Sequence, residues 1–460
     1  MEIIKDKKIL KIIEKIKNAI KLTRLENHVF ITGGAIRDSI LNTPIKDLDL
    51  VVDVEDGGIV VANLLAAKEK CYVMHTNPVI FPTYGTAKVC LFKDEDLKDI
   101  NIEFVEARKC AYELGKKCLG TLEEDSKRRD LTINSLYWNI NDGKLYDYNQ
   151  AIDDMTTQTL RTVDPSIFAE NPIKMMRVIR FSAEFGWDIE KDTWLGIIQH
   201  YHLIKNAPKE LISAELSKIL TSPNPSVGIR KLRYCGLLKM ILPDIYDLNS
   251  VYESKNPAIT VFDHTMNVLN EVQPFIENRL AALFHDVGSI VTQTNRTVSP
   301  DMFSGEVAAS ELLDLRFPKD VCNAVETAIR YHRIFKIYGD GITPPDGKIR
   351  KFINLCGDNI GTTLDLMNAN NLHCTYGKKK RQVMDVLARM EKLEEIEKDK
   401  KIKLPIDGND ILAMYKNMKP GGWIAKALDA VKEAYYENPN ITREECLEIA
   451  RKQVKVLILA

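Results

Sequence analysis

An apolar run, a pair of glycines and a helical pattern follow one another near the start of the chain. The run VFIT at 29–32 leads into Gly33 and Gly34, where a helical pattern begins, and Arg37 lies one turn further on. Glycines allow the backbone to approach a phosphate closely, and the N-terminus of a helix favours anions. This order predicts a phosphate-binding turn between a strand and a helix, although glycine pairs also occur in ordinary turns.

Strand patterns continue to about residue 150 and then give way to helical ones. Residues 1–25 favour an amphipathic helix. Apolar and β-branched runs typical of strands follow at 47–54, 85–92, 101–107, 132–140 and 144–148. Helical periods dominate the rest of the chain, with proline-containing breaks at 222–226, 242–244 and 342–347. We therefore predict an α+β chain, with a mixed-sheet head followed by helical parts.

Composition and net charge limit the binding partners and the cellular compartment that we expect for this chain. The 460 residues suffice for two to four domains, and a formal net charge of −1 does not by itself indicate a nucleic-acid partner. No apolar run approaches the roughly 18–20 residues that span a bilayer, so we expect no membrane partner. The nine cysteines include no C-x-x-C pair, which argues against a disulfide framework or a zinc ribbon and indicates a reducing compartment. We predict a cytoplasmic protein.

Two carboxylates stand two residues apart in the run DLDLVVDV. In a strand, Asp47 and Asp49 would point to the same face, and paired oxygen ligands suit Mg²⁺. Taken alone, the pair could equally be a solvated strand edge. Taken with the upstream GG-x-x-R-D, it resembles the nucleotidyltransferase signature of the polymerase-beta superfamily. That resemblance implies metal ions that activate a 3′-hydroxyl and steady the leaving pyrophosphate. Glu103, on another predicted strand, is either a third carboxylate or a plain exposed residue.

The segment GTLEEDSKRRDLTINSL at 120–136 narrows the resemblance. It is similar to the R-R-D segment of class II tRNA nucleotidyltransferases and bacterial poly(A) polymerases, and it follows the earlier motifs in the expected order. The resemblance implies that the triphosphate and ribose of an incoming nucleotide contact Arg128, Arg129, Asp130 and Asn134. Guanidinium groups suit phosphate and a carboxylate suits a ribose hydroxyl. The alternative is a solvated run of charges.

The segment ENPIKMMRVIRF at 170–181 combines an apolar helical pattern with a short row of cations. By resemblance, Arg177 and Arg180 face the triphosphate. The family usually has E-D-x-x-R here, and its Asp and Arg read the base edge of CTP or ATP. This chain has Asn171 and Lys174 instead. A carboxylate only accepts hydrogen bonds, whereas an amide both donates and accepts. We therefore predict relaxed or altered base choice.

A second departure concerns the order of addition. The family's DP-x-x-G-G element, which couples head and neck, is degraded here to DYNQAIDD at 147–154. Its loss puts ordered switching from C to A addition in doubt.

The central helical region resembles an HD phosphohydrolase domain whose metal site is damaged. His264, His285 and Asp286 have the expected spacing and His332 is retained. The stretch MFSGEVAAS lacks a His that relatives carry, and Asn370 stands where they have Asp. Because Asn is a poorer ligand for a hard cation, we expect a folded scaffold. The basic run YGKKKRQ at 376–382 is either a tRNA contact or a solvated face.

The resemblance covers nearly the whole chain and is greatest to bacterial CCA-adding enzymes. It implies a head at 1–148, a neck with the base pocket at 149–248, an HD-like body at 249–398 and a tail at 399–460. It also implies template-independent CCA addition to tRNA from CTP and ATP, with Mg²⁺ as cofactor. Poly(A) polymerase activity, or another base preference, is the alternative within the same chemistry. An HD phosphohydrolase and a non-catalytic RNA-binding protein are the alternatives from other classes.

Overall fold

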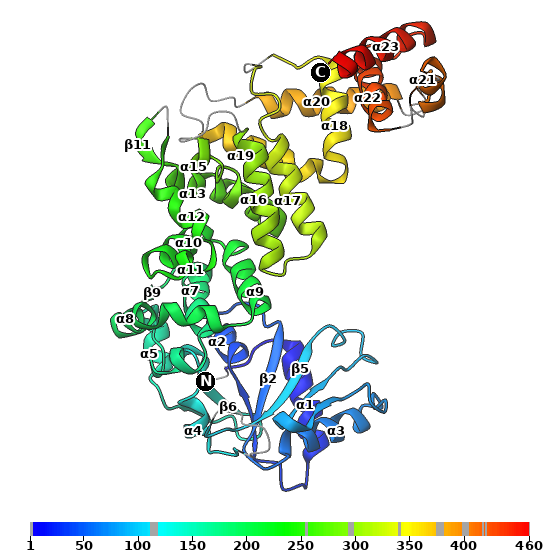
Figure 1. Cartoon of the computed structure of the whole chain (residues 1–460). Coiled ribbons are helices and arrows are strands. Elements are labelled where there is room, and N and C mark those ends of the chain that lie inside the picture. The colour runs from blue at the N-terminus through cyan, green and yellow to red at the C-terminus, as the bar shows by residue number, and fades with distance from the viewer. Residues whose placement is uncertain are drawn as a thin grey trace. The chain divides into compact units, whose positions relative to one another are not determined.

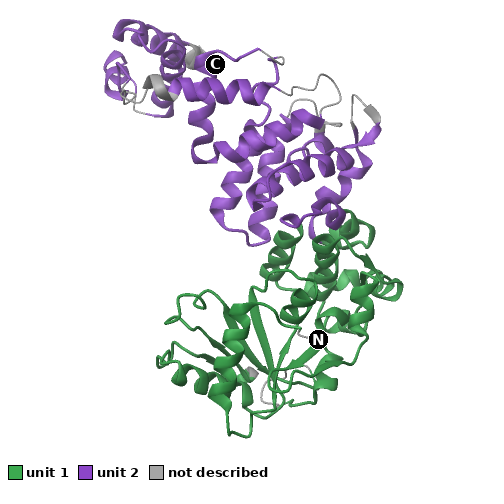
Figure 2. Cartoon of the chain, turned by 180° about the vertical axis from the view of Figure 1, so that it is seen from behind, with its two compact units in different colours: residues 1–219, 230–240 green, residues 220–229, 241–460 purple. Residues whose placement is uncertain are grey.

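The computed structural model in Figure 1 describes most of the chain. The described residues are 3–110, 118–253, 256–292, 299–338, 342–373, 381–397, 404–415, 418 and 421–459. They form two compact units, coloured separately in Figure 2. One unit comprises residues 1–219 and 230–240, and the other comprises 220–229 and 241–460. The proposed four-part division into head, neck, body and tail stays a prediction.

A seven-stranded mixed sheet organises the first unit. Its strands are β1 (Val29–Thr32), β2 (Asp47–Val52), β3 (Val79–Phe81), β4 (Thr86–Val89), β5 (Asn101–Glu106), β6 (Leu136–Asn139) and β7 (Leu145–Asp147). They are ordered β3-β4-β5-β2-β1-β6-β7, and only the β2–β5 pair is parallel. Six of these strands lie in the runs predicted from sequence. The edge strand β3, three residues long and exposed, was not predicted.

Rows of buried apolar side chains hold the helices of the first unit in place. Helix α1 (Lys7–Ile20) lies within the predicted 1–25 and buries five isoleucines at helical spacing. It packs against α3 (Gly57–Lys68), which the sequence analysis did not single out. Within β2, the fully buried Leu48 and Leu50 alternate with Asp47 and Asp49. The alternation places both aspartates on the opposite face of the strand from the buried leucines.

Short helices and two small strands complete the first unit and lead into the second. They are α2 (Gly34–Ile40), α4 (Leu122–Ser126), α5 (Ala151–Thr156), β8 (Thr159–Leu160), α6 (Ile167–Glu170), α7 (Ile173–Phe185), β9 (Asp188–Ile189), α8 (Lys191–His200), α9 (Lys209–Leu220), α10 (Pro225–Tyr234) and α11 (Leu237–Ile241). Helix α7 is the one that bears the cationic row. It buries Met175, Met176, Val178, Ile179 and Phe181.

The second unit is helical apart from one two-stranded ribbon. Its elements are α12 (Pro243–Asp247), β10 (Tyr252–Glu253), β11 (Asn256–Thr260), α13 (Val261–Glu271), α14 (Ile276–Phe284), α15 (Ser289–Thr292), α16 (Pro300–Asp314), α17 (Lys319–Tyr331), α18 (Asp346–Cys356), α19 (Ile360–His373), α20 (Gln382–Glu397), α21 (Gly408–Met414), α22 (Gly422–Glu437) and α23 (Arg443–Leu459). The predicted α+β class, with a mixed sheet followed by helices, is therefore confirmed. Within the described ranges, no helix has both the length and the apolarity to cross a membrane.

One sequence prediction falls largely outside the described residues, and another is wrong. Most of the basic run at 376–382 lies outside the described residues, which resume at Arg381. The expectation of unpaired cysteines is wrong for Cys110 and Cys118, which form a disulfide. An antiparallel bridge between Arg108 and Leu119 brings the ends of this segment together, a contact that cysteine spacing does not reveal.

Candidate functional site

Three carboxylates meet on neighbouring strands of the sheet. Strands β2 and β5 lie side by side (Figure 1), and their register sets Asp49 directly beside Glu103. Asp47 is two residues away on the same face, and its Oδ1 accepts a hydrogen bond of 2.9 Å from the Asn101 side chain. Burial, and then the charges of Glu103 and Asp47, raise the pKa of Asp49. Crowded carboxylates of this kind favour a bound cation.

The glycine turn closes on the same carboxylates. Gly33 has φ +66° and ψ −135°, a conformation that residues with a Cβ rarely adopt. A Cβ at Gly33 would lie 3.6 Å from Asp49 Oδ2. Helix α2 begins at Gly34, so its first backbone N–H groups lie close to the carboxylate pair. The predicted turn thus exists and lies beside the predicted carboxylates.

A continuous chain of hydrogen bonds runs from α2 through the R-R-D segment to α7. Arg37 donates to Asn134 Oδ1 over 2.6 Å, and the Asn134 amide donates to Asp130 Oδ1 over 3.0 Å. Arg177 Nε donates to Asp130 Oδ2 over 2.6 Å. Burial alone would raise the pKa of Asp130, but Arg177 and Asn134 hold it well below its usual range. Asp130 therefore stays ionised and fixes the residues around it.

Glu215 is a second buried counter-charge, and the sequence analysis did not single it out. Its carboxylate lies 3.4 Å from Arg180 Nε and 3.9 Å from Arg177 Nη1. The sequence carried a signal, because Glu215 falls between Ile212 and Ile219 on the apolar face of α9. An acid on such a face needs a partner.

The other predicted cations surround the same centre in different ways. Arg129 is held by Asp125, with Nη2 to Oδ2 at 2.8 Å, and Tyr137 donates to the same oxygen over 2.6 Å. Lys174 Nζ donates to the main-chain oxygen of Arg128 over 2.7 Å. Burial lowers the pKa of Lys174 to about 8, and nearby arginines oppose its charge further. Such a cluster attracts a polyanion.

The two positions predicted to read the base differ in their surroundings. Lys174 is partly buried against the R-R-D segment, as described above. Asn171 is exposed at the end of α6, and its side chain makes no hydrogen bond to the described residues. Its neighbour Glu170 pairs with Arg128 at 3.4 Å, and both line a hollow of about 210 Å³ with Ile167. The base-reading roles themselves remain predictions.

The donor chemistry of the carboxylate set suits a divalent metal, although among the described residues the one group of three ligand atoms close enough to hold an ion is that of His264, His285 and Asp286. Asp47, Asp49 and Glu103 offer hard oxygen donors on two adjacent strands, all lining one cavity. Burial and, after it, the charge of Glu103 raise the pKa of Asp49, and a bound cation would offset both effects. Metal ions held by paired carboxylates act as Lewis acids on phosphoryl oxygens.

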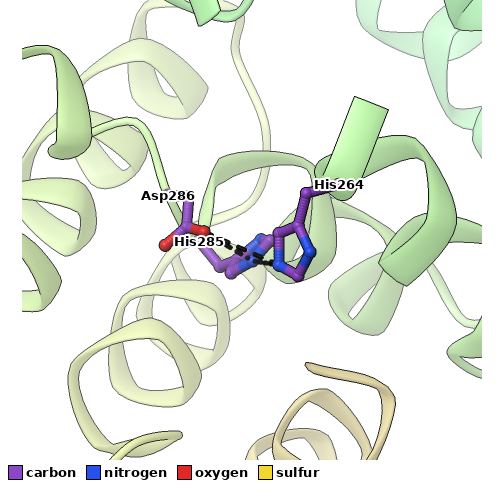
Figure 3. A group of neighbouring side chains, drawn as sticks. All are labelled: His264, His285 and Asp286. Carbon is purple, nitrogen blue, oxygen red and sulfur yellow. Dashed lines mark hydrogen bonds and ion pairs between the residues drawn. The ribbon is translucent and has the colours of Figure 1, made fainter. Parts of the chain in front are cut away.

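The second unit contains the HD-like cluster, shown in Figure 3. Ligand atoms of His264, His285 and Asp286 all lie within 4.8 Å of one another. His285 Nδ1 is 2.8 Å from the Ala282 main-chain oxygen, so it donates there and leaves Nε2 as an acceptor. His264 Nε2 is 3.0 Å from Asn370 Oδ1 and 3.3 Å from His285 Nε2, so it donates to these acceptors. His285 Nε2 also lies 3.2 Å from Asp286 Oδ2, a second acceptor that cannot donate to it.

An arginine beside the cluster supplies a positive charge to Asp286. Arg333 forms a short ion pair with Asp286 Oδ1 and a 3.1 Å pair with Asp301. His332 donates to the Ile329 main-chain oxygen over 2.7 Å, while its buried Nε2 has no hydrogen-bond partner in the structure. The predicted residues His264, His285, Asp286, His332 and Asn370 thus come together. Arg333 neutralises Asp286 and Asn370 is uncharged, which weakens the donor set for a two-metal hydrolase, while the ligand atoms of His264, His285 and Asp286 lie close enough together to hold one ion.

The mixed sheet, the carboxylate pair and the arginines around Asp130 define a nucleotidyltransferase. Comparison with known proteins agrees. The model "Poly A polymerase head domain" matches residues 29–161, and "Probable RNA and SrmB- binding site of polymerase A" matches 186–248. A "Multifunctional CCA protein" of Neisseria gonorrhoeae is 30% identical over 323 residues, covering 67% of this chain and 75% of that protein. A "CC-adding tRNA nucleotidyltransferase" of Thermus thermophilus is 28% identical over 347 residues, with 71% and 76% covered.

A solved structure shows the same fold. The Bacillus stearothermophilus CCA-adding enzyme in complex with CTP aligns with a TM-score of 0.65 at 19% identity, covering 98% of both chains. The chain belongs to the tRNA nucleotidyltransferase and poly(A) polymerase family, and it is an enzyme.

Proposed function

We propose that this enzyme adds nucleotides, ending in CCA, to the 3′ end of tRNA without a nucleic-acid template. The observation that carries the proposal is the hydrogen-bonded chain Arg37–Asn134–Asp130–Arg177 beside the carboxylate pair. Such a chain holds cations in fixed positions for a triphosphate, next to carboxylates suited to metal ions. Relatives that carry CCA-adding and CC-adding names support the choice of substrate.

The chemistry is an in-line displacement at phosphorus. The 3′-oxygen of the RNA attacks the α-phosphorus of CTP or ATP, and a new bond to the 3′-oxygen forms. The bond from the α-phosphorus to the oxygen that bridges to the β-phosphate breaks, pyrophosphate leaves and the hydroxyl proton passes to solvent. Arg177, Arg180 and the α2 N-terminus bind and orient the triphosphate. Asp130 and Glu215 keep the two arginines of α7 in place.

We propose Mg²⁺ as the metal, held by Asp47 and Asp49 with Glu103 as a third carboxylate. Hard oxygen donors that leave room for water and phosphate are what Mg²⁺ prefers. When bound, the ions supply Lewis acidity to the attacking and leaving oxygens. Aspartates on a strand are rigid carriers for such ions, because the alternating Leu48 and Leu50 anchor this strand in the core.

Base choice is the open part of the function, and Asn171 and Lys174 are the residues to test. The ammonium of Lys174 already donates to the Arg128 main-chain oxygen, so it is directed toward the phosphate-binding segment. Asn171, exposed and without a side-chain partner among the described residues, is free to meet a base. An amide there accepts and donates, which weakens rejection of U and G by about 1–3 kcal/mol. Poly(A) polymerase activity or C-only addition are the variants of the same chemistry.

Incorporation of single and mixed nucleoside triphosphates tests the proposal. The substrates are tRNAs that end at the discriminator base, at C and at CC, and the products are sequenced. The Asp49→Ala variant is the blank. Clean CCA would support the proposal and refute relaxed base choice, whereas long A tails or C-only products would identify the alternative chemistry. Absence of any metal-dependent incorporation would refute the nucleotidyltransferase function of the chain.

We place the enzyme in the cytoplasm and assign its helical body to tRNA binding by shape and phosphate contacts. Six of the described cysteines carry free thiols, which supports a reducing compartment, while the Cys110–Cys118 disulfide does not. Hydrolysis of cyclic phosphates by the HD-like cluster is the less favoured function. Its direct test is release of product from 2′,3′-cyclic AMP by the wild type but not by His285→Ala.

A further inference from the structure

One aromatic ring is shared by three of the arginines in the cationic cluster. The guanidinium carbons of Arg180, Arg37 and Arg177 lie 4.2, 5.0 and 5.8 Å from the centroid of the Phe181 ring. All three distances fall within the ~6 Å at which the face of an aromatic ring attracts a cation. The ring itself is buried. A neutral side chain therefore contacts three cations that come from two different helices.

Helical spacing and a second aromatic residue place the Phe181 ring. Phe181 follows Arg177 by one turn of α7, so the two side chains share a face of the helix. Phe185, a further turn along, stacks on Phe181 with ring centroids 5.7 Å apart and planes inclined by 14°. The guanidinium carbon of Arg37, which belongs to α2, also lies 5.2 Å from the Phe185 centroid. The two rings therefore join Arg37 to the arginines of α7.

Arg180 depends on the ring more than the other two arginines do. Its buried Nε lies 3.4 Å from Glu215 Oε2, but neither atom has a hydrogen-bond partner among the described residues. Arg37 and Arg177, by contrast, each donate hydrogen bonds to polar side chains. A buried polar group without a hydrogen bond needs another source of attraction. For Arg180 that source is the Phe181 ring, which is closer to it than to either of the other arginines.

A ring and a carboxylate hold an arginine with different consequences for an incoming phosphate. A carboxylate cancels the charge of the arginine that it binds and occupies some of its N–H groups. An aromatic ring attracts a guanidinium through its quadrupole and carries no net charge. A guanidinium that lies over a ring keeps its N–H groups at its rim, where they can donate to phosphate oxygens. Cations held by a ring therefore stay available to an anionic ligand.

We propose that Phe181 is a positioning residue for nucleotide binding, whose ring holds Arg37, Arg177 and Arg180 together so that they receive the triphosphate as one group. Phe185 supports the same arrangement through its contacts with Phe181 and Arg37. The inference deepens the proposed function and rests on it, because it takes these arginines to bind the triphosphate. It follows that the electron density of the ring, and not only its size, sets the affinity for a nucleoside triphosphate.

Fluorinated phenylalanines incorporated at position 181 test the ring's charge distribution at nearly constant shape. Analogues with one, two and three ring fluorines withdraw electrons stepwise from the ring face and so weaken its attraction for cations. In calorimetric titrations the Kd of ATP should rise with each added fluorine, by about 5- to 30-fold for three, which corresponds to ~1–2 kcal/mol. The Kd of CTP should rise in parallel, since both ligands carry the same triphosphate. The Kd of tRNA measured without nucleotide should not change, although a general loss of structure would raise it.

The same analogues at Phe168 provide the matched control. Phe168 is fully buried in α6, and its ring makes no cation–π contact with the described residues. Its fluorinated variants should keep the ATP Kd of the wild type. Cyclohexylalanine at position 181 complements the series, because it keeps the bulk of the side chain and removes the π electrons. It should raise the ATP Kd at least as much as three fluorines do, and thermal unfolding verifies that each variant folds.

The outcomes separate this inference from the proposed function. An ATP Kd that stays constant across the series at position 181, or that rises equally at position 168, would overturn the inference and leave nucleotide transfer standing. A graded rise confined to position 181, in an enzyme that incorporates no nucleotide into tRNA, would refute the transfer function and support Phe181 as a positioning residue for triphosphate binding. A wild type that binds neither ATP nor CTP would overturn both.

Discussion

Replacement of Gly33 by alanine tests whether the backbone of the glycine turn is held in a conformation closed to other residues. Gly33 combines φ +66° with ψ −135°. For a residue with a Cβ, a sparsely populated conformation of this kind costs ~1–3 kcal/mol. Alanine also lowers the entropy of the unfolded chain, which returns about 0.4–1 kcal/mol. The net loss of unfolding free energy for Gly33→Ala should therefore be about 1–2 kcal/mol.

The loss has a measurable thermal equivalent. Gly33 belongs to a compact unit in the upper part of the 150–250-residue range, for which 1 kcal/mol lowers Tm by ~2–4 °C. Gly33→Ala should thus lower Tm by roughly 2–8 °C. Catalysis should suffer more than stability does, because the new methyl would lie 3.6 Å from Asp49 Oδ2.

Gly34→Ala is the matched control for this substitution. Gly34 starts helix α2 without a positive φ, and a Cβ there would meet the ends of the Arg37 and Asp38 side chains at 3.4 and 3.7 Å. Its Tm should stay within about 1 °C of the wild type, since alanine is a good helix former. Differential scanning calorimetry and steady-state incorporation of ATP into tRNA measure both quantities. Equal Tm values for Gly33→Ala and the wild type would refute the argument from backbone strain.

Three further predictions concern charges and metals. Because burial lowers the pKa of Lys174 to about 8 and a triphosphate favours its charged form, ATP binding should take up a proton. The ATP dissociation constant should then rise by up to tenfold per pH unit above pH 8, and Lys174→Met should remove this dependence in calorimetric titrations. Glu215→Gln leaves Arg177 and Arg180 without their shared counter-charge, so urea unfolding should show a loss of about 3 kcal/mol. Added ATP should raise the Tm of that variant more than that of the wild type. Asn370→Asp should retain about one Mn²⁺ per chain more than the wild type does after gel filtration, measured by mass spectrometry, because a second carboxylate would then face His264.

The head of the fold could be predicted from sequence because its signals are local. The glycine pair, the alternation of DLDLVVDV and the isoleucine spacing of α1 each follow from one element's geometry. Edge strand β3 was missed, because three exposed apolar residues do not alternate with polar ones. Its assignment depends on pairing with β4, which is a tertiary contact.

The candidate site could be predicted as a list of residues but not as a network. Motif spacing identified Arg37, Asn134, Asp130 and Arg177, yet their hydrogen-bonded order joins positions up to 97 residues apart in the chain. Glu215 was missed because one acid on an apolar helix face is a weak signal without its arginines. Sequence reasoning also treated Lys174 as a base reader, and only the fold brings its ammonium to the Arg128 main-chain oxygen.

The separation between the buried charge network and the exposed Asn171 has a consequence for how this enzyme can evolve. Asp130 pairs with Arg177, and Glu215 lies near both Arg177 and Arg180, so a substitution of either acid should disturb the proposed transfer reaction and the stability of the fold together. Asn171 is exposed with no side-chain partner among the described residues, so under its proposed role a mutation there should change base preference and leave the charge network intact. Selection can therefore adjust which nucleotide is added through single mutations at a tolerant position, while the machinery of phosphoryl transfer is inherited unchanged.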